Sequence, residues 1–135
     1  MHQKIEVIGR LGKDPESRYT PSGQQVTSFS VATDHQYTNG SGEKIKETTW
    51  LRVSVWGKSA QACAEYLKKG SLVFVEGRLT PDKETGGPRL WTKTDGTQSA
   101  SFEITASNVR FLSARGESQT AHEDSQAQDS EEVPF

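Results

Sequence analysis

The 135-residue chain has one cysteine, three scattered histidines and no apolar run near the roughly 20 residues that cross a bilayer. A lone Cys63 excludes an intramolecular disulfide framework, and the spacing of His2, His35 and His122 does not fit a metal site. The N-terminus leads directly into strand-like sequence rather than a secretory signal. These absences predict a protein with no metal, no cofactor and no membrane span, located in the cytoplasm.

Motifs for catalysis are also missing. Gly57-Lys58-Ser59 resembles the end of a phosphate-binding loop, but Arg52 stands where that motif requires its first glycine. The chain has no Gly-x-Ser-x-Gly elbow, no histidine beside a plausible nucleophile and no recognisable pair of carboxylates. The sequence therefore predicts a protein that is not an enzyme.

Charge divides the chain into two unequal parts. Residues 1–115 hold 16 basic and 12 acidic residues, whereas residues 116–135 hold six acids and no Lys or Arg. The second part is rich in Ser, Gln and Ala and has few residues that could form a core, which predicts a disordered acidic tail. The first part is a single basic domain, and such a split favours a nucleic-acid or partner surface on the domain over a merely solubilising tail.

The domain contains five β-rich runs separated by turn-forming residues. The predicted strands are residues 5–11, 26–33, 48–56, 72–79 and 101–112. Ala60, Cys63, Ala64 and Leu67 recur at helical spacing, which predicts one short amphipathic helix over residues 58–69, ended by Gly70, with Cys63 as a core residue. Two segments rich in turn formers, 34–46 and 80–99, are predicted hairpin loops. A helix between the third and fourth of five strands is the element order of the OB-fold, a Greek-key barrel whose open face and loops bind oligonucleotides or oligosaccharides.

The segment from Thr48 to Trp56 carries the strongest functional signal. Strand alternation sends Leu51, Val53 and Val55 to the core, and places Trp50, Arg52 and Trp56 together on the other side. Large exposed aromatics mark binding sites, and indoles beside cations suit the unpaired bases and phosphates of single-stranded nucleic acid. A helix, a loop or a second subunit could instead cover both tryptophans, and this strand alone does not decide between the two readings.

Further aromatic and basic residues favour the binding hypothesis. Tyr37 and Trp91 lie on the two predicted loops, each near basic residues, as expected of a clamp around a strand. The residues predicted to stack on bases are therefore Trp50, Trp56, Tyr37 and Trp91. Those predicted to contact phosphates are Arg10, Lys13, Arg18, Lys44, Arg52, Lys58, Lys68, Lys69, Arg89 and Lys93.

At this point the chain resembles the bacterial-type single-stranded DNA-binding protein family. The resemblance rests on residues 7–16 with Arg18-Tyr19, and on residues 29–33, 50–58, 65–71 and 75–79. It resumes at the C-terminus, where Glu131, Glu132, Val133, Pro134 and Phe135 are similar to the acidic tip through which family members dock replication and repair proteins. The resemblance implies an all-β OB-fold that forms a homotetramer, binds single-stranded DNA irrespective of sequence in replication, recombination and repair, and is associated with the bacterial nucleoid.

A primosome-type adaptor of the same fold, acting mainly through protein contacts, is the alternative. Such adaptors generally lack an acidic tip ending in phenylalanine, so Phe135 favours the DNA-binding hypothesis. An OB-fold nuclease or transferase is a third reading, which the missing catalytic motifs disfavour.

Overall fold

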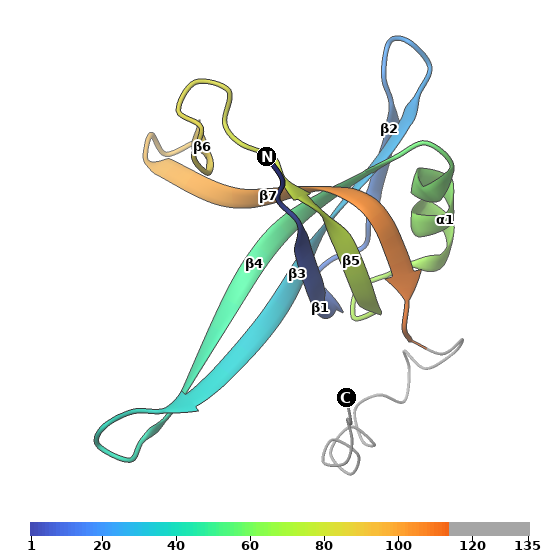
Figure 1. The fold of residues 1–135 in the computed structure, drawn as a ribbon. Helices are drawn as coiled ribbons and strands as arrows, with labels where there is room; N and C mark the ends of the chain where they lie inside the picture. Colours follow the sequence, from blue (N-terminus) through green and yellow to red (C-terminus); the bar gives the residue numbers. More distant parts are fainter. Residues whose placement is uncertain (114–135) are drawn as a thin grey trace.

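The computed structural model describes residues 1–113, in which seven strands and one helix form a barrel with two projecting arms (Figure 1). The predicted acidic tail, residues 116–135 with its tip, lies outside the described residues. The elements are β1 (Ile5–Leu11), β2 (Glu16–Tyr19), β3 (Gln25–Thr38), β4 (Lys44–Trp56), α1 (Lys58–Tyr66), β5 (Leu72–Leu79), β6 (Arg89–Thr92) and β7 (Gln98–Phe111).

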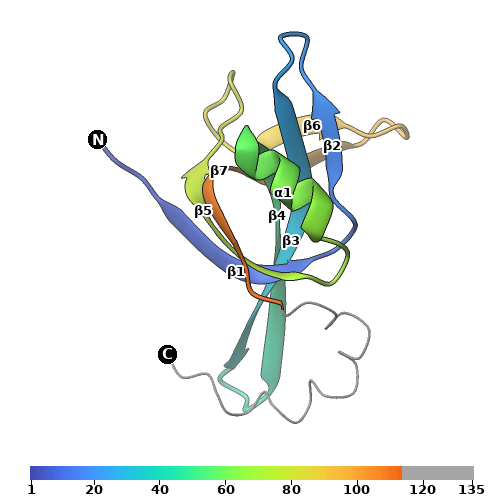
Figure 2. The same ribbon diagram turned by 90° about the vertical axis from the view of Figure 1, so that its right-hand side faces the viewer.

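Five strands close the barrel in the order β1-β5-β7-β4-β3, and β3 returns to β1 through the pairs Arg10–Ala32 and Leu11–Val31. The β4–β7 pair is parallel and the other pairs are antiparallel. Strands β2 and β6 extend the sheet outside the ring, on β3 and β7 respectively. Helix α1 follows β4 and packs on β3, β4 and β2 (Figure 2). The predicted OB-fold with one short helix is confirmed.

The core consists of the side chains that strand alternation turns inward. On β4 these are Leu51, Val53 and Val55, as the sequence predicts, and all three are buried. Each such aliphatic side chain contributes about 1.5–3 kcal/mol when it is removed from water. Cys63 of α1 is buried in the same cluster, and loss of solvation raises the pKa of its thiol to about 11, so it is a core residue and not a reactive one.

The segment predicted as a loop over residues 34–46 is mostly strand. Strands β3 and β4 stay paired out to Thr38 and Lys44, so that a two-stranded arm projects from the barrel (Figure 1). The turn between them is held by Asn39, whose Oδ1 accepts hydrogen bonds from the backbone N–H groups of Ser41 and Glu43, each at 2.9 Å. The hairpin is confirmed, but the prediction ended the first strand too early, at residue 33, and began the second too late, at residue 48. Both faces of the arm are exposed and give no apolar alternation to read.

Helix α1 is shorter than the predicted 58–69. It ends at Tyr66 because Leu67 adopts an extended backbone, with φ −94° and ψ 151°, and turns its side chain into the core. Gly70 has a φ of +88° but belongs to the turn that leads into β5 and does not cap the helix. Strand β2, which the sequence did not predict, and strand β6, which lies in the predicted loop 80–99, are exposed throughout and again lack an apolar pattern. Within residues 1–113 no helix has the length and apolarity needed to cross a membrane.

Candidate nucleic-acid interface

The outward face of β4 carries two open tryptophans. Trp50 is 54% exposed and Trp56 is 41% exposed, with Arg52 exposed between them. The two tryptophans are six positions apart along the strand, which corresponds to about 20 Å at 3.3 Å per residue. Neither α1 nor a loop of residues 1–113 buries them, so the predicted exposure is confirmed for the isolated chain.

The ring of Trp50 lies close against the backbone at Gly12. A Cβ added to Gly12 would lie 2.5 Å from Cζ3 and 2.8 Å from Cη2 of the indole, closer than real Cβ atoms come. The absence of a side chain at position 12 therefore lets the six-membered ring rest on the chain that links β1 to β2. The ring is supported by this contact while more than half of the residue stays open to a ligand.

The second projecting arm, formed by β6 and the start of β7, places Trp91 near Trp50. Strand β6 pairs with the start of β7, with Arg89 opposite Ser101 and Trp91 opposite Ser99. The turn of this arm is closed by Asp95, which accepts hydrogen bonds from the N–H and the hydroxyl of Thr97; these bonds hold the pKa of the Asp95 carboxyl below its usual range. Trp91 itself is 46% exposed.

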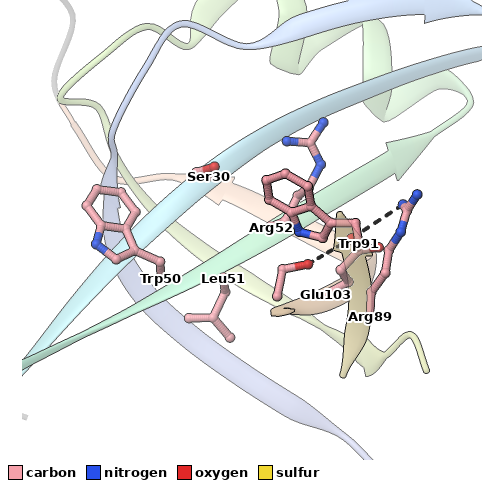
Figure 3. A pocket seen from close by; sticks show the side chains of 8 residues that line it. Ser30, Trp50, Leu51, Arg52, Arg89, Trp91 and Glu103 are labelled. Carbon is pink, nitrogen blue, oxygen red and sulfur yellow. Dashed lines mark hydrogen bonds and ion pairs between the residues drawn. The ribbon is translucent and has the colours of Figure 1, made fainter. Parts of the chain in front are cut away.

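Trp50 and Trp91 line one open hollow of about 420 Å³. Figure 3 shows the two indoles on different sides of it, with Arg52 and Arg89 near Trp91. The lining residues come from β3, β4, β6 and β7 and are Ser30, Trp50, Leu51, Arg52, Arg89, Trp91, Ser101 and Glu103. Two aromatic faces and two guanidinium groups thus converge from segments far apart in the sequence.

Glu103 is the charged member of this hollow that the sequence did not indicate. Its Oε2 lies 3.6 Å from Nη1 of Arg89 and accepts a hydrogen bond from Ser101 Oγ at 3.2 Å, and its side chain is 16% exposed. It also stands beside Arg52 in the parallel β4–β7 register. Only that register places it there, and a parallel pairing of residues 51 positions apart leaves no local pattern in a sequence.

Two more of the predicted phosphate contacts share this face. Arg10 pairs with Ala32, and Ala32 pairs with Trp50, so one row crosses three strands. Arg18 forms an equivalent row with Val26 and Trp56. Because directly opposed residues of a sheet lie on one side, both arginines border the tryptophan face. Nη1 of Arg10 donates to the carbonyl of Gly70 at 2.9 Å, which anchors that side chain.

The remaining predicted residues are exposed but lie away from the hollow. Tyr37 is on the opposite face of the β3–β4 arm, paired with Ile45 and stacked on His35 with ring centroids 6.0 Å apart. The cations distributed elsewhere are Lys13 after β1, Lys44 at the end of the arm, Lys58 at the start of α1, Lys68 and Lys69 beyond its end, and Lys93 in the β6–β7 turn. The tip residues Glu131 to Phe135 fall outside the described residues.

An OB-fold barrel that exposes supported indoles and arginines on one face belongs to the oligonucleotide- and oligosaccharide-binding class. Residues 2–112 match the single-strand binding protein family, so the chain belongs to that family. Members of this family are non-enzymatic DNA-binding proteins.

Individual single-stranded DNA-binding proteins are similar in sequence to this chain. The single-stranded DNA-binding protein of Neisseria meningitidis serogroup A is 38% identical over 114 residues, which cover 84% of this chain and 62% of that protein. Single-stranded DNA-binding protein 1 of Chlorobaculum tepidum is 39% identical, over 83% of this chain and 65% of its own length. The chain therefore spans less than two thirds of the length of these relatives.

Two solved structures of single-stranded DNA-binding proteins have a similar fold. The Plasmodium falciparum SSB complex with single-stranded DNA superposes with a TM-score of 0.69 at 28% identity, covering 83% of this chain and 96% of that one. A deletion mutant of the single-stranded DNA binding protein from Thermus aquaticus gives 0.65 at 30% identity, over 84% of this chain and 51% of that one.

Proposed function

We propose that the protein binds single-stranded DNA irrespective of sequence, by stacking bases on exposed aromatic rings while lysines and arginines follow the phosphates. The observation that carries this proposal is the convergence of Trp50, Trp91, Arg52 and Arg89 on one open hollow. Stacking of a base on an aromatic side chain contributes about 1–3 kcal/mol and tolerates every base, since each has a π-face. The mechanism needs no catalysis and no cofactor.

Preference for single strands over duplex follows from the same chemistry. Paired bases hide their faces in the stack, so a duplex offers the indoles little beyond its phosphates. Each phosphate neutralised on a single strand contributes about −0.7 to the slope of log affinity against log salt. Binding should therefore weaken as salt rises.

The wider biological role is part of the proposal. We infer that the protein coats exposed strands during replication, recombination and repair at the bacterial nucleoid, as a homotetramer. Ile8, which is 50% exposed and lies opposite Phe74 on the outer side of β1 and β5, supports a subunit contact on that side. The tip from Glu131 to Phe135 would recruit replication and repair proteins.

The direct test of the function is fluorescence anisotropy with a labelled oligo-dT and a labelled duplex of equal length, at low and high salt. Tight binding of the single strand alone, weakened by salt, is expected. Trp50→Ala should weaken it, whereas Tyr66→Ala, which removes an exposed aromatic on α1, should not. Equal affinity for strand and duplex, or none for either, would move the assignment to a protein adaptor of this fold.

The tip is tested separately. A chain truncated after residue 130 should bind oligo-dT as tightly as the full chain or more tightly, because five residues that include two negative charges are removed. The same truncation should abolish pull-down of replication and repair proteins from a bacterial extract. Weaker DNA binding by a truncated chain that remains folded would contradict the proposal that the tip recruits proteins and does not help to bind DNA.

A further inference from the structure

The segment that links β1 to β2 supports the indole of Trp50 but has few backbone bonds of its own. Gly12, against which the ring lies, donates its N–H to the carbonyl of Ser30 at 3.1 Å. Residues 13–15 make no backbone-to-backbone hydrogen bond within the described part of the chain, and β2 begins only at Glu16. The three residues after Gly12 therefore need a side chain to anchor them.

The side chain of Asp14 is such an anchor. Its Oδ1 accepts a hydrogen bond from the backbone N–H of Lys69 at 2.9 Å, across 55 positions of the sequence. Pro15 restricts the residue before it to extended backbone conformations, so Asp14 loses little further freedom when it makes this bond. The bond ties the middle of the segment to the turn between α1 and β5.

The turn at residues 68–71 is itself firmly held. The N–H of Lys68 donates to Ser71 Oγ, and the N–H of Ser71 donates to the carbonyl of Lys68, each at 3.0 Å. The N–H of Gly70 donates to the carbonyl of Leu11 at 2.9 Å. With the bond to Asp14, all four N–H groups of the turn have an acceptor, so the segment is tied to a fixed point and not to another loose loop.

We propose that Asp14 is a positioning residue for Trp50: its bond to the turn at residues 68–71 keeps the segment at Gly12 in place beneath the indole. A ring on a fixed support holds one orientation before DNA arrives, so less freedom is lost when the ligand binds. Asp14 itself does not meet the strand in this role, since its carboxylate would repel a phosphate. The inference rests on the proposed function and adds to it a residue that acts through another.

The test compares two substitutions that remove the same charge. Asp14→Ala deletes the acceptor, whereas Asp14→Asn keeps an oxygen that can still accept the N–H of Lys69. Loss of a negative charge near a bound polyanion should by itself tighten binding in both variants. We expect Asp14→Ala to bind oligo-dT about 3- to 5-fold more weakly than the wild type, within the value of one net hydrogen bond. Asp14→Asn should bind at least as tightly as the wild type.

The state of the Trp50 ring is measured without DNA. In a chain that carries Trp56→Phe and Trp91→Phe, Trp50 is the single indole, so acrylamide quenching reports its exposure and fluorescence anisotropy reports its motion. Adding Asp14→Ala should raise the quenching and lower the anisotropy. Adding Asp14→Asn should change neither.

Asp14→Glu is a second variant for the case in which Asp14→Ala folds poorly. It keeps the charge but lengthens the side chain by one methylene, which displaces the acceptor, and it should loosen the Trp50 ring in the same way. An unchanged Trp50 signal in Asp14→Ala, or equal oligo-dT affinities for the Ala and Asn variants, would overturn the inference. Failure of the wild type to bind oligo-dT would overturn the proposed function, whereas the Trp50 signal of the free protein would still test the role of Asp14.

Discussion

Trp50 and Trp56 stand on the same face of the same strand, yet their surroundings differ. Trp50 rests on the backbone at Gly12 and shares a hollow with Trp91 and two arginines. Trp56 lies in a row with Val26 and Arg18, with no second tryptophan in that row. The comparison teaches that exposure alone does not define a stacking site: a ring held in place, with a second ring and cations nearby, loses less freedom on binding.

The largest expected effect is the loss of oligo-dT affinity when the ring of Trp50 or of Trp56 is removed. Trp50→Ala should cost about 2–3 kcal/mol of oligo-dT affinity, near the upper end for one stacked base, and Trp56→Ala about 1 kcal/mol. Anisotropy titrations at fixed salt would measure both. Equal losses would mean that the hollow adds nothing to what an exposed indole provides.

The support beneath Trp50 can be removed without touching the ring. Gly12→Ala should weaken oligo-dT binding about tenfold, because its Cβ forces the indole to shift from its present orientation. Gly40→Ala is the matched control, since no atom lies within 4 Å of a Cβ there. Tryptophan emission and affinity would be recorded for both variants; a shifted emission with wild-type affinity would show that the orientation of Trp50 is unimportant.

The salt dependence of oligo-dT binding tests whether the DNA contacts only the Trp50 end of β4 or also the Trp56 end. Arg52→Gln should reduce the salt slope of oligo-dT binding by about 0.7, as expected for one lost phosphate contact. Arg18→Gln, which borders Trp56, should give a similar reduction only if the strand extends to that end. An unchanged slope in Arg18→Gln would confine the DNA path to the hollow.

The smallest expected effect is that of low pH on the turn of the β6–β7 arm, which carries Trp91. The pKa of Asp95 is lowered by the N–H and then by the hydroxyl of Thr97, so its bonds stabilise the turn above its usual pKa of 3.8 and are lost as pH falls below that value. The Trp91 indole resonance should therefore broaden or shift in NMR spectra recorded from about pH 4 down to about pH 2. In Asp95→Asn, which cannot titrate, the resonance should stay constant over that range.

Much of the fold follows from local pattern. The alternation of Leu51, Val53 and Val55 identified both the core side of β4 and its tryptophan side, and the spacing from Ala60 to Leu67 located the helix. Strands β2 and β6 and the outer ends of β3 and β4 were missed because exposed strands carry no apolar period. Helix α1 was drawn too long because Leu67 continues the apolar stripe while its backbone has already left the helix.

Single residues of the candidate site were predictable from the sequence, but their arrangement in space was not. Trp50, Arg52 and Trp91 were each identified from residue type and position, but their convergence depends on the β6–β7 arm and the parallel β4–β7 pairing. Glu103 was missed for the same reason. Tyr37 has the expected chemistry, and the register of the arm puts it on the opposite face from Trp50. Its role in binding stays a prediction.

The central claim is that the hollow is where bases stack, and tryptophan fluorescence tests it most directly. In a Trp56→Phe variant the two remaining indoles, Trp50 and Trp91, both line the hollow. Titration with oligo-dT is predicted to quench most of their emission, while a duplex of equal length leaves it nearly unchanged. Tight binding of oligo-dT without quenching would contradict the claim, because the strand would then be held somewhere other than against these two rings.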